Sequence, residues 1–253
     1  MRETISPLIS IVTVCYNSEK YLEWVFESLA AQTFRDFEHI VIDGGSSDNT
    51  LGIIRRNKNT ISYWISETDN GLYDALNKGF YVAKGKWIGI LHSDDFFSSE
   101  RALEQVANLL IETNPGLLYS DLVYVKESDT EAVLRYWKAG LYRRALLRRG
   151  WMPPHPTVFI SRGLFGQVGG FDLRYEIAAD YDFLLRCFLH NPVVYYLPEV
   201  VVRMRVGGKS NGGLVNIVRK SREDLRIISN HGIGGICTLL LKNLRKLKQF
   251  FVR

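Results

Sequence analysis

The sequence has few of the residues that mark disulfide-rich or zinc-binding proteins. Its 253 residues include three cysteines (Cys15, Cys187 and Cys237), which are far apart and form no Cys-x-x-Cys pair. This odd, scattered set argues against both a disulfide framework and a zinc site. The N-terminus lacks the basic-then-apolar pattern of a signal peptide, so we expect a reducing, cytoplasmic setting.

Long apolar runs and low-complexity linkers are also absent from the sequence. The longest clearly apolar stretch, from Gly232 to Leu241, is too short to cross a bilayer. The 46% of hydrophobic residues are enough for a sizeable core, in one large domain or in one domain plus a tail.

The net charge of +5 is concentrated near the C-terminus. Residues 216–253 hold nine Lys or Arg and two acids, which gives +7. The other 215 residues hold 23 basic and 25 acidic groups, which gives −2. No nucleic-acid partner is expected, because the main body is slightly acidic and contains no recognised nucleic-acid module.

Strand-like and helix-like segments alternate over the first half of the chain. This alternation predicts an α/β fold with a Rossmann-like sheet flanked by helices. After residue 115, short strands mix with helices near 140–149 and 179–190, which indicates a mixed sheet. We predict strands at 9–14, 37–42, 61–65, 87–91, 117–125, 131–136, 157–160, 193–197 and 200–205, and further helices at 19–31, 48–56, 71–83, 99–112, 213–229 and 235–251.

Three polar segments follow predicted strands, and ligands of such sheets bind beyond the carboxyl ends of the strands. These segments begin at Cys15, Asp43 and His92. We therefore expect the site at this edge. The Gly-x-Gly-x-x-Gly fingerprint and the Walker A motif are both missing, which disfavours a nicotinamide dehydrogenase and a P-loop enzyme.

The candidate site residues in these segments and further along the chain have two interpretations each. Asp94 and Asp95 follow a buried strand and suit a hard cation such as Mg²⁺ or Mn²⁺, but Asp95 also suits the cap of the next helix. Asp43, in Asp-Gly-Gly-Ser, suits a ligand-binding loop or a plain turn. Asp180 opens an amphipathic helix, as a cap or as a general base. His155 lies in a stiff Pro-rich segment, where a histidine is more often structural.

Taken together, these motifs resemble the inverting glycosyltransferases of family 2, which have the GT-A fold. The resemblance covers about residues 8–212, which we take as the catalytic domain, with residues 213–253 as basic amphipathic helices. The matching segments are Ser10 to Asn17, Gln32 to Phe37, Asp43 to Thr50, Asp69 to Gly79, and His92 to Asp95.

The resemblance implies a role for each matching residue. Asp180 takes the place of the catalytic base, and Asp95 that of the metal ligand. His155 and Ser210, the latter in a Gly-Gly-x-Ser segment, are accessory candidates. The implied nucleotide-sugar contacts are Thr13, Tyr16, Asn17, Asp43, Gly44, Asp69, Asn77, Lys78 and Asp94.

Two departures from the family pattern affect this assignment. Gly44 stands where many members have an Asp that contacts uracil, so Asp43 or Asp69 takes over or the base differs. His92 replaces the first acid of the usual Asp-x-Asp, so metal binding rests mainly on Asp95.

The resemblance implies transfer of a sugar from a UDP-sugar, with a Mn²⁺ or Mg²⁺ cofactor and inversion at the anomeric carbon. A saccharide or polyprenyl-linked acceptor is expected, in lipopolysaccharide, capsule or exopolysaccharide biosynthesis. The alternative is a non-catalytic nucleotide-sugar-binding protein of the same fold. The retained acids at Asp95 and Asp180 argue against that alternative.

The C-terminal segment has an amphipathic pattern. Leu240, Leu244, Leu247 and Phe251 share one side, while Lys242, Arg245, Lys246 and Lys248 lie elsewhere. The pattern suits an interfacial helix on the anionic inner face of the cell membrane. It equally suits a helix packed on the domain with a solvated basic face.

Overall fold

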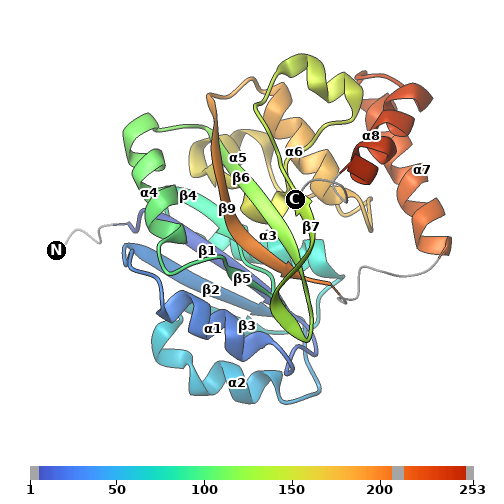
Figure 1. Cartoon of the computed structure of the whole chain (residues 1–253). Coiled ribbons are helices and arrows are strands. Elements are labelled where there is room, and N and C mark those ends of the chain that lie inside the picture. Colours follow the sequence, from blue (N-terminus) through green and yellow to red (C-terminus); the bar gives the residue numbers. More distant parts are fainter. Residues whose placement is uncertain (1–5, 207–213, 249–253) are drawn as a thin grey trace.

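A mixed nine-stranded sheet forms the centre of the computed structural model, which describes residues 6–206 and 214–248. Figure 1 shows helices on both sides of it. The strand order is β3-β2-β1-β4-β8-β6-β9-β5, with β7 paired to β6. The strands are β1 (Ile9–Cys15), β2 (Phe37–Asp43), β3 (Tyr63–Ser66), β4 (Trp87–Ile90), β5 (Asp95–Phe97), β6 (Leu117–Lys126), β7 (Asp129–Trp137), β8 (Phe159–Ser161) and β9 (Val194–Arg205).

The strands β3, β2, β1 and β4 run parallel, which confirms the expected Rossmann-like half. Beyond β4 the sheet turns mixed, because β8 is antiparallel to β4 and to β6, whereas β9 is parallel to β6. The helices are α1 (Leu22–Ala30), α2 (Thr50–Arg56), α3 (Leu72–Val82), α4 (Ala102–Thr113), α5 (Arg162–Val168), α6 (Ala179–Leu189), α7 (Leu214–Asn230) and α8 (Ile236–Lys248), with 3-10 turns η1 (Lys58–Thr60), η2 (Arg144–Arg149) and η3 (His155–Thr157).

Strand β1 shows why the sheet has two buried faces. Its side chains alternate, as a strand requires. Ile9 and Ile11 join the cluster under α1, α2 and α4, whereas Val12 and Val14 join the cluster under α3, α5 and α6. Both faces are covered, so the strand is apolar almost throughout, as parallel strands usually are.

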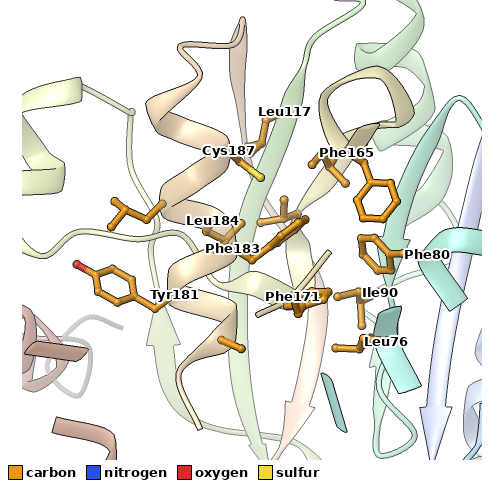
Figure 2. Packing of buried hydrophobic residues seen from close by; sticks show 14 of the residues in the cluster. Leu76, Phe80, Ile90, Leu117, Phe165, Phe171, Tyr181, Phe183, Leu184 and Cys187 are labelled. Atoms are coloured by element: carbon orange, nitrogen blue, oxygen red, sulfur yellow. The ribbon is translucent and has the colours of Figure 1, made fainter. Parts of the chain in front are cut away.

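Helix α6, which carries Asp180, is held on the sheet by aromatic side chains. Phe183 packs against Phe171 with ring centroids 4.4 Å apart, and Phe80 of α3 lies edge-on to Phe165, Phe171 and Phe183. Figure 2 shows these rings filling the space between α6 and the sheet. Buried aromatic pairs of this kind contribute about 0.5–1.5 kcal/mol each beyond their buried area.

Several predicted elements differ from the structure. Residues Asp95–Phe97 form strand β5, and α4 begins only at Ala102, so the prediction that a helix starts near residue 99 is wrong by three residues. The helix expected near 140–149 is the 3-10 turn η2. The strands expected at 193–197 and 200–205 are one strand, β9. Pro198 between them has no N–H to donate, but a register shift at this point lets the strand continue.

The C-terminal helices pack on the part of the chain that contains α6 and η2. Ile227 and Ile228 of α7 are fully buried in the cluster that holds α6. From α8, the Thr238 hydroxyl donates to the Arg148 carbonyl of η2 at 2.8 Å. The boundary predicted at residue 212 falls in 207–213, outside the described residues. Within the described ranges, no helix combines the length and apolar composition needed to cross a bilayer.

Candidate active site

The polar segments after β1, β2 and β4 meet at the carboxyl edge of the sheet, as predicted. The Asn17 amide N–H donates to the Ser46 hydroxyl at 2.8 Å, and the Asn17 side chain accepts from the Ser47 N–H at 2.8 Å. The Ser18 hydroxyl donates to that of Ser93 at 3.0 Å. One hydrogen-bonded surface therefore joins all three strand ends.

Tyr16 and Asn17 form the rim of this surface. Asn17 adopts a left-handed conformation (φ 48°), which asparagine tolerates better than most residues. This turn leaves the Tyr16 ring 54% exposed beside the Asp43 turn. A half-exposed aromatic face at such an edge is suited to stacking on a planar ligand.

Asp43 organises the turn that follows β2. It is fully buried, and its carboxylate accepts from the backbone N–H groups of Gly45 and Ser46 at 3.2 and 3.0 Å. It also accepts from the hydroxyl groups of Ser46 and, at 2.6 Å, Ser66. The turn interpretation therefore describes Asp43 well, and its carboxylate shapes the loop from below.

Gly44 leaves room for the Asp69 side chain. A Cβ atom at position 44 would overlap the Asp69 carboxylate, which also accepts from the Gly71 N–H at 2.8 Å. Nearby, the Lys78 ammonium lies 2.8 Å from Glu67 and 3.4 Å from the Thr68 carbonyl. The structure therefore puts an acid from the segment before α3 into the space above Gly44.

Two predicted contact residues are engaged inside the fold. Thr13 is fully buried, with its hydroxyl 3.0 Å from His39 Nε2 on the α1 side of the sheet. The Asn77 amide exchanges two hydrogen bonds with the Phe171 backbone, at 2.9 and 2.7 Å. Both residues thereby fix the scaffold, and the structure does not bring them to the polar edge.

Asp95 is the most unusual acid at this edge. It lies at the start of β5, opposite Met204 of β9, and α4 begins seven residues later without a side-chain cap. The alternative that Asp95 caps this helix is therefore wrong. The side chain is fully buried, and neither of its oxygens has a hydrogen-bond partner among the described residues.

Burial, and then the neighbouring Asp94 carboxylate, raise the pKa of Asp95 well above its usual value. Burial also raises the pKa of Asp94. The guanidinium of Arg205 offsets part of this unfavourable charge. It donates to the Asp94 carbonyl at 2.7 Å and lies over the rings of Trp24 and Phe96, 4.5 and 4.6 Å from their centroids.

These residues fit a divalent cation whose coordination is completed by the phosphates of a bound substrate. The described residues contain no cluster of three or more His, Cys, Asp or Glu side chains that could hold a metal alone. Mg²⁺ is commonly held by one or two carboxylates together with substrate phosphates. The buried, unpartnered oxygens of Asp95 are such a ligand, and His92 is turned toward His155.

Asp180 lies across the site, at the second residue of α6. Its carboxylate lies 3.3 Å from His155 Nδ1 and 3.4 Å from the Tyr73 hydroxyl oxygen. Burial alone would raise the pKa of Asp180. The pKa nevertheless lies below its usual value, because His155 and the cationic Lys220 and Lys242 stabilise the carboxylate. An ionised carboxylate of this kind is suited to accept a proton.

His155 connects the two acidic parts of the site. Its Nε2 lies 3.1 Å from Nε2 of His92, which follows β4. Burial lowers the pKa of both rings, that of His92 to about 3. At least one of the two Nε2 atoms is unprotonated in this contact, because two N–H groups cannot face each other at this distance.

Two contributors to the site, Tyr73 and Arg205, are not predicted from the sequence. Tyr73 reaches Asp180 from α3, within the Asp69-to-Gly79 segment that was considered only for the donor. Arg205 ends a predicted strand, and its position beside two acids depends on the pairing of β9 with β5. Ser210 lies outside the described residues.

The comparisons with known proteins show the family of this chain. The pattern of Glycosyl transferase family 2 matches residues 10–167, and the chain belongs to this family. It is 36% identical over 211 residues to a PGL/p-HBAD biosynthesis glycosyltransferase of Mycobacterium bovis, covering 81% of this chain and 80% of the relative. An uncharacterized glycosyltransferase of Mycobacterium tuberculosis is 33% identical over 202 residues, covering 74% of this chain and 71% of the relative.

Solved structures share the GT-A fold with this chain. The mannosyltransferase PcManGT of Pyrobaculum calidifontis, in complex with GDP-Man and Mn²⁺, superposes with a TM-score of 0.67 at 18% identity, over 98% of this chain and 74% of that one. S. aureus TarS 1-349 in complex with UDP-GlcNAc gives 0.67 at 20% identity, over 88% of this chain. The match spans 66% of that TarS chain, just under two thirds.

Proposed function

We propose that the protein transfers a sugar from a UDP-sugar to a saccharide or polyprenyl-linked acceptor, with inversion at the anomeric carbon. The observation that carries this proposal is a pair of buried carboxylates in opposite environments. Asp95 has no hydrogen-bond partner among the described residues and a raised pKa, whereas Asp180 has a histidine partner and a lowered pKa. Such divergence separates a ligand for positive charge from a base.

In this proposal, Asp180 accepts the proton of the acceptor hydroxyl while the hydroxyl oxygen attacks the anomeric carbon of the donor sugar. His155 holds the carboxylate in place through Nδ1. Asp95 holds Mn²⁺ or Mg²⁺, which when bound supplies positive charge to the departing diphosphate. Tyr16 stacks on the nucleotide base, and Asp69, above Gly44, takes the place of the acid that other members carry at that position.

A panel of donors tests the proposal. The purified protein is incubated with UDP-glucose, UDP-GlcNAc, UDP-galactose or GDP-mannose, with MnCl₂ or EDTA, and nucleotide release is measured. We expect metal-dependent release from a UDP-sugar. Asp180→Asn should lower turnover by about 100-fold and leave UDP affinity unchanged. Asp95→Ala should abolish metal-dependent UDP binding. Binding without release from any donor would instead favour the non-catalytic alternative.

We also propose that the acceptor belongs to bacterial surface polysaccharide biosynthesis. The Gly207-to-Asn211 segment resembles one in the family members that make lipopolysaccharide, capsule or exopolysaccharide, and it lies outside the described residues. The printed names of the relatives refer to PGL/p-HBAD biosynthesis and do not single out any of these three.

We further propose that the enzyme works at the cytoplasmic face of the membrane and docks there through α8. Ile236, Leu240 and Leu244 are 66%, 56% and 56% exposed at helical spacing on one side of α8. The opposite side carries Thr238 and Lys242 against the domain. Lys242 is buried, so the expectation that it belongs to a solvated basic face is wrong.

Vesicle flotation tests this docking. The wild type should float with phosphatidylglycerol vesicles and not with phosphatidylcholine vesicles. The double variant Leu240→Ser/Leu244→Ser should lose most of this binding, because about 0.8 kcal/mol is lost for each CH₂ group no longer buried in lipid. Ile111→Ser, at an equally exposed position on α4, is the matched control. Equal flotation of the three proteins would contradict the proposal.

A further inference from the structure

The backbone segment that leads into α6 is bound by a side chain from α7. The Glu223 carboxylate accepts hydrogen bonds from three consecutive N–H groups, those of Glu176 at 3.1 Å, Ile177 at 2.9 Å and Ala178 at 2.9 Å. Three charge-assisted bonds from one carboxylate are a strong local restraint, because bonds to an ionised acceptor are about twice as strong as neutral ones.

This contact is related to a capping box, in which a Glu side chain accepts from the N–H of the N-cap residue. The N-cap of α6 is Ala178, which offers no side-chain hydrogen bond of its own. Glu223 binds the Ala178 N–H from a helix 45 residues further along the chain, and the other two N–H groups belong to the residues that precede the helix. The negative charge of Glu223 also suits a helix N-terminus.

The same segment is also held from the sheet side. The Tyr73 hydroxyl donates to the Ile177 carbonyl at 2.8 Å. Ile177 is therefore bound through its N–H by α7 and through its C=O by α3. Asp180 follows three residues later, and its position relative to His155 depends on where α6 begins.

Helix α7 is itself fixed, so it can act as a support. Ile227 and Ile228 are fully buried, one turn beyond Glu223. The adjacent Asp224 is buried and accepts from Lys242 of α8 at 2.5 Å. Glu223 therefore projects from a helix that is packed on the domain at two further points.

We propose that Glu223 is a positioning residue for Asp180, so that the C-terminal helix α7 is a working part of the active site. This inference rests on the proposed function, in which Asp180 is the base. Loss of the Glu223 carboxylate frees three N–H groups in the segment that leads into α6 and lets Asp180 move relative to His155. Misplacement of a reacting group by about 1 Å can lower the rate by about 100-fold.

The test compares three variants. Glu223→Ala removes the acceptor, Glu223→Gln keeps one oxygen acceptor, and Arg219→Ala is the matched control. Arg219 also joins α7 to this segment, through an exposed ion pair with Glu176 at 2.7 Å, but binds none of the three N–H groups. Turnover and KM are measured with the donor that the panel selects, and amide exchange of residues 176–180 is followed by mass spectrometry.

We expect kcat to fall about 10- to 100-fold in Glu223→Ala and less in Glu223→Gln, with the donor KM within about 2-fold of wild type. Amide exchange should accelerate in the same order, and Arg219→Ala should match wild type in both measurements. Unchanged kcat in Glu223→Gln and Glu223→Ala, despite faster exchange, would overturn the inference, as would a parallel loss in Arg219→Ala. Full turnover of Asp180→Asn would instead refute the proposed base itself.

Discussion

Asp95→Asn should make the metal-free protein more stable, even though it removes a residue that the proposed function requires. The wild-type carboxylate is fully buried, has no hydrogen-bond partner among the described residues, and has a raised pKa. The unfolded chain solvates this charge, whereas the folded protein does not. Asparagine has nearly the same shape and no charge, so it removes the larger part of this penalty.

The expected gain follows from the cost of leaving a buried polar group unsatisfied, about 1–3 kcal/mol and more when it is charged. The asparagine amide keeps part of that cost, so we expect a net gain of about 1–2 kcal/mol. For a chain of this size, each kcal/mol shifts Tm by about 2–4 °C. Calorimetry in EDTA should therefore show a rise of about 2–8 °C, and urea unfolding should give the free energy.

Asp121→Asn is the matched control, because Asp121 is equally buried but fully partnered. Its carboxylate accepts from the Ala139 N–H and the Tyr196 hydroxyl at 2.8 Å, and from the Tyr136 hydroxyl at 2.9 Å. This variant should lose about 1–3 kcal/mol, since the amide mismatches one of these donors. A loss of stability in Asp95→Asn like that in Asp121→Asn would refute the description of Asp95 as a destabilising, ligand-ready carboxylate.

Ligand binding should reverse the order of the two proteins. UDP with Mn²⁺ at about 100 times its Kd should stabilise the wild type by about 2.7 kcal/mol. Asp95→Asn should gain little from the same addition. A residue that costs stability without its ligand and returns it with the ligand follows the trade-off expected of binding sites. Equal stabilisation of both proteins would remove Asp95 from the metal site.

Three further predictions concern the scaffold and the donor. Burial lowers the pKa of His39 to about 3, so below about pH 6.5 the unfolded chain binds a proton at this residue that the folded protein does not bind. The wild type should therefore lose about 2 kcal/mol of stability from this residue between pH 7 and pH 5. Urea titrations should show that this part of the loss is missing in His39→Gln. Lys242→Met leaves the buried Asp224 carboxylate without its ion-pair partner and should lower the free energy of unfolding by about 3 kcal/mol, as measured by calorimetry. Adding Asp224→Leu should restore most of this stability, and no recovery would contradict the argument. Asp69→Asn should weaken UDP binding about 10-fold by calorimetry, and Gly44→Asp should clash with Asp69 and lose binding unless combined with Asp69→Gly.

Local patterns were sufficient to predict most of the first half of the fold. The strands β1, β2 and β4 are apolar, β-branched runs, and each is followed by a polar turn, so their boundaries and the polar edge follow from short segments. Strand β5 could not be found in this way. Its three residues, Asp95–Phe97, form a strand because Arg203 and its neighbours on β9 pair with them, about 100 residues further along the chain.

The directions of two side chains explain why the structure differs from the predicted set of donor contacts. Thr13 lies between Ile11 and Cys15 on the strand face that points toward α1, so period two along β1 places its hydroxyl beneath that helix. The strand pattern contained this information, although the resemblance to the family suggested a donor contact. For Asn77 no pattern was available, because its partner Phe171 is 94 residues away.

The charge pattern of the C-terminus predicts a basic surface, but it does not reveal which charged residues are bonded within the fold. The two acids among residues 216–253 are Glu223 and Asp224, and both are bonded within the fold, to the α6 entry and to Lys242. These pairs attach the helices to the domain, while Arg219, Arg222 and Arg226 remain exposed. Packing on the domain and the proposed docking on an anionic membrane would therefore use different residues of the same helices, and the two interpretations of the sequence are compatible. On this arrangement the helices would both support Asp180 and turn a basic surface toward the lipid.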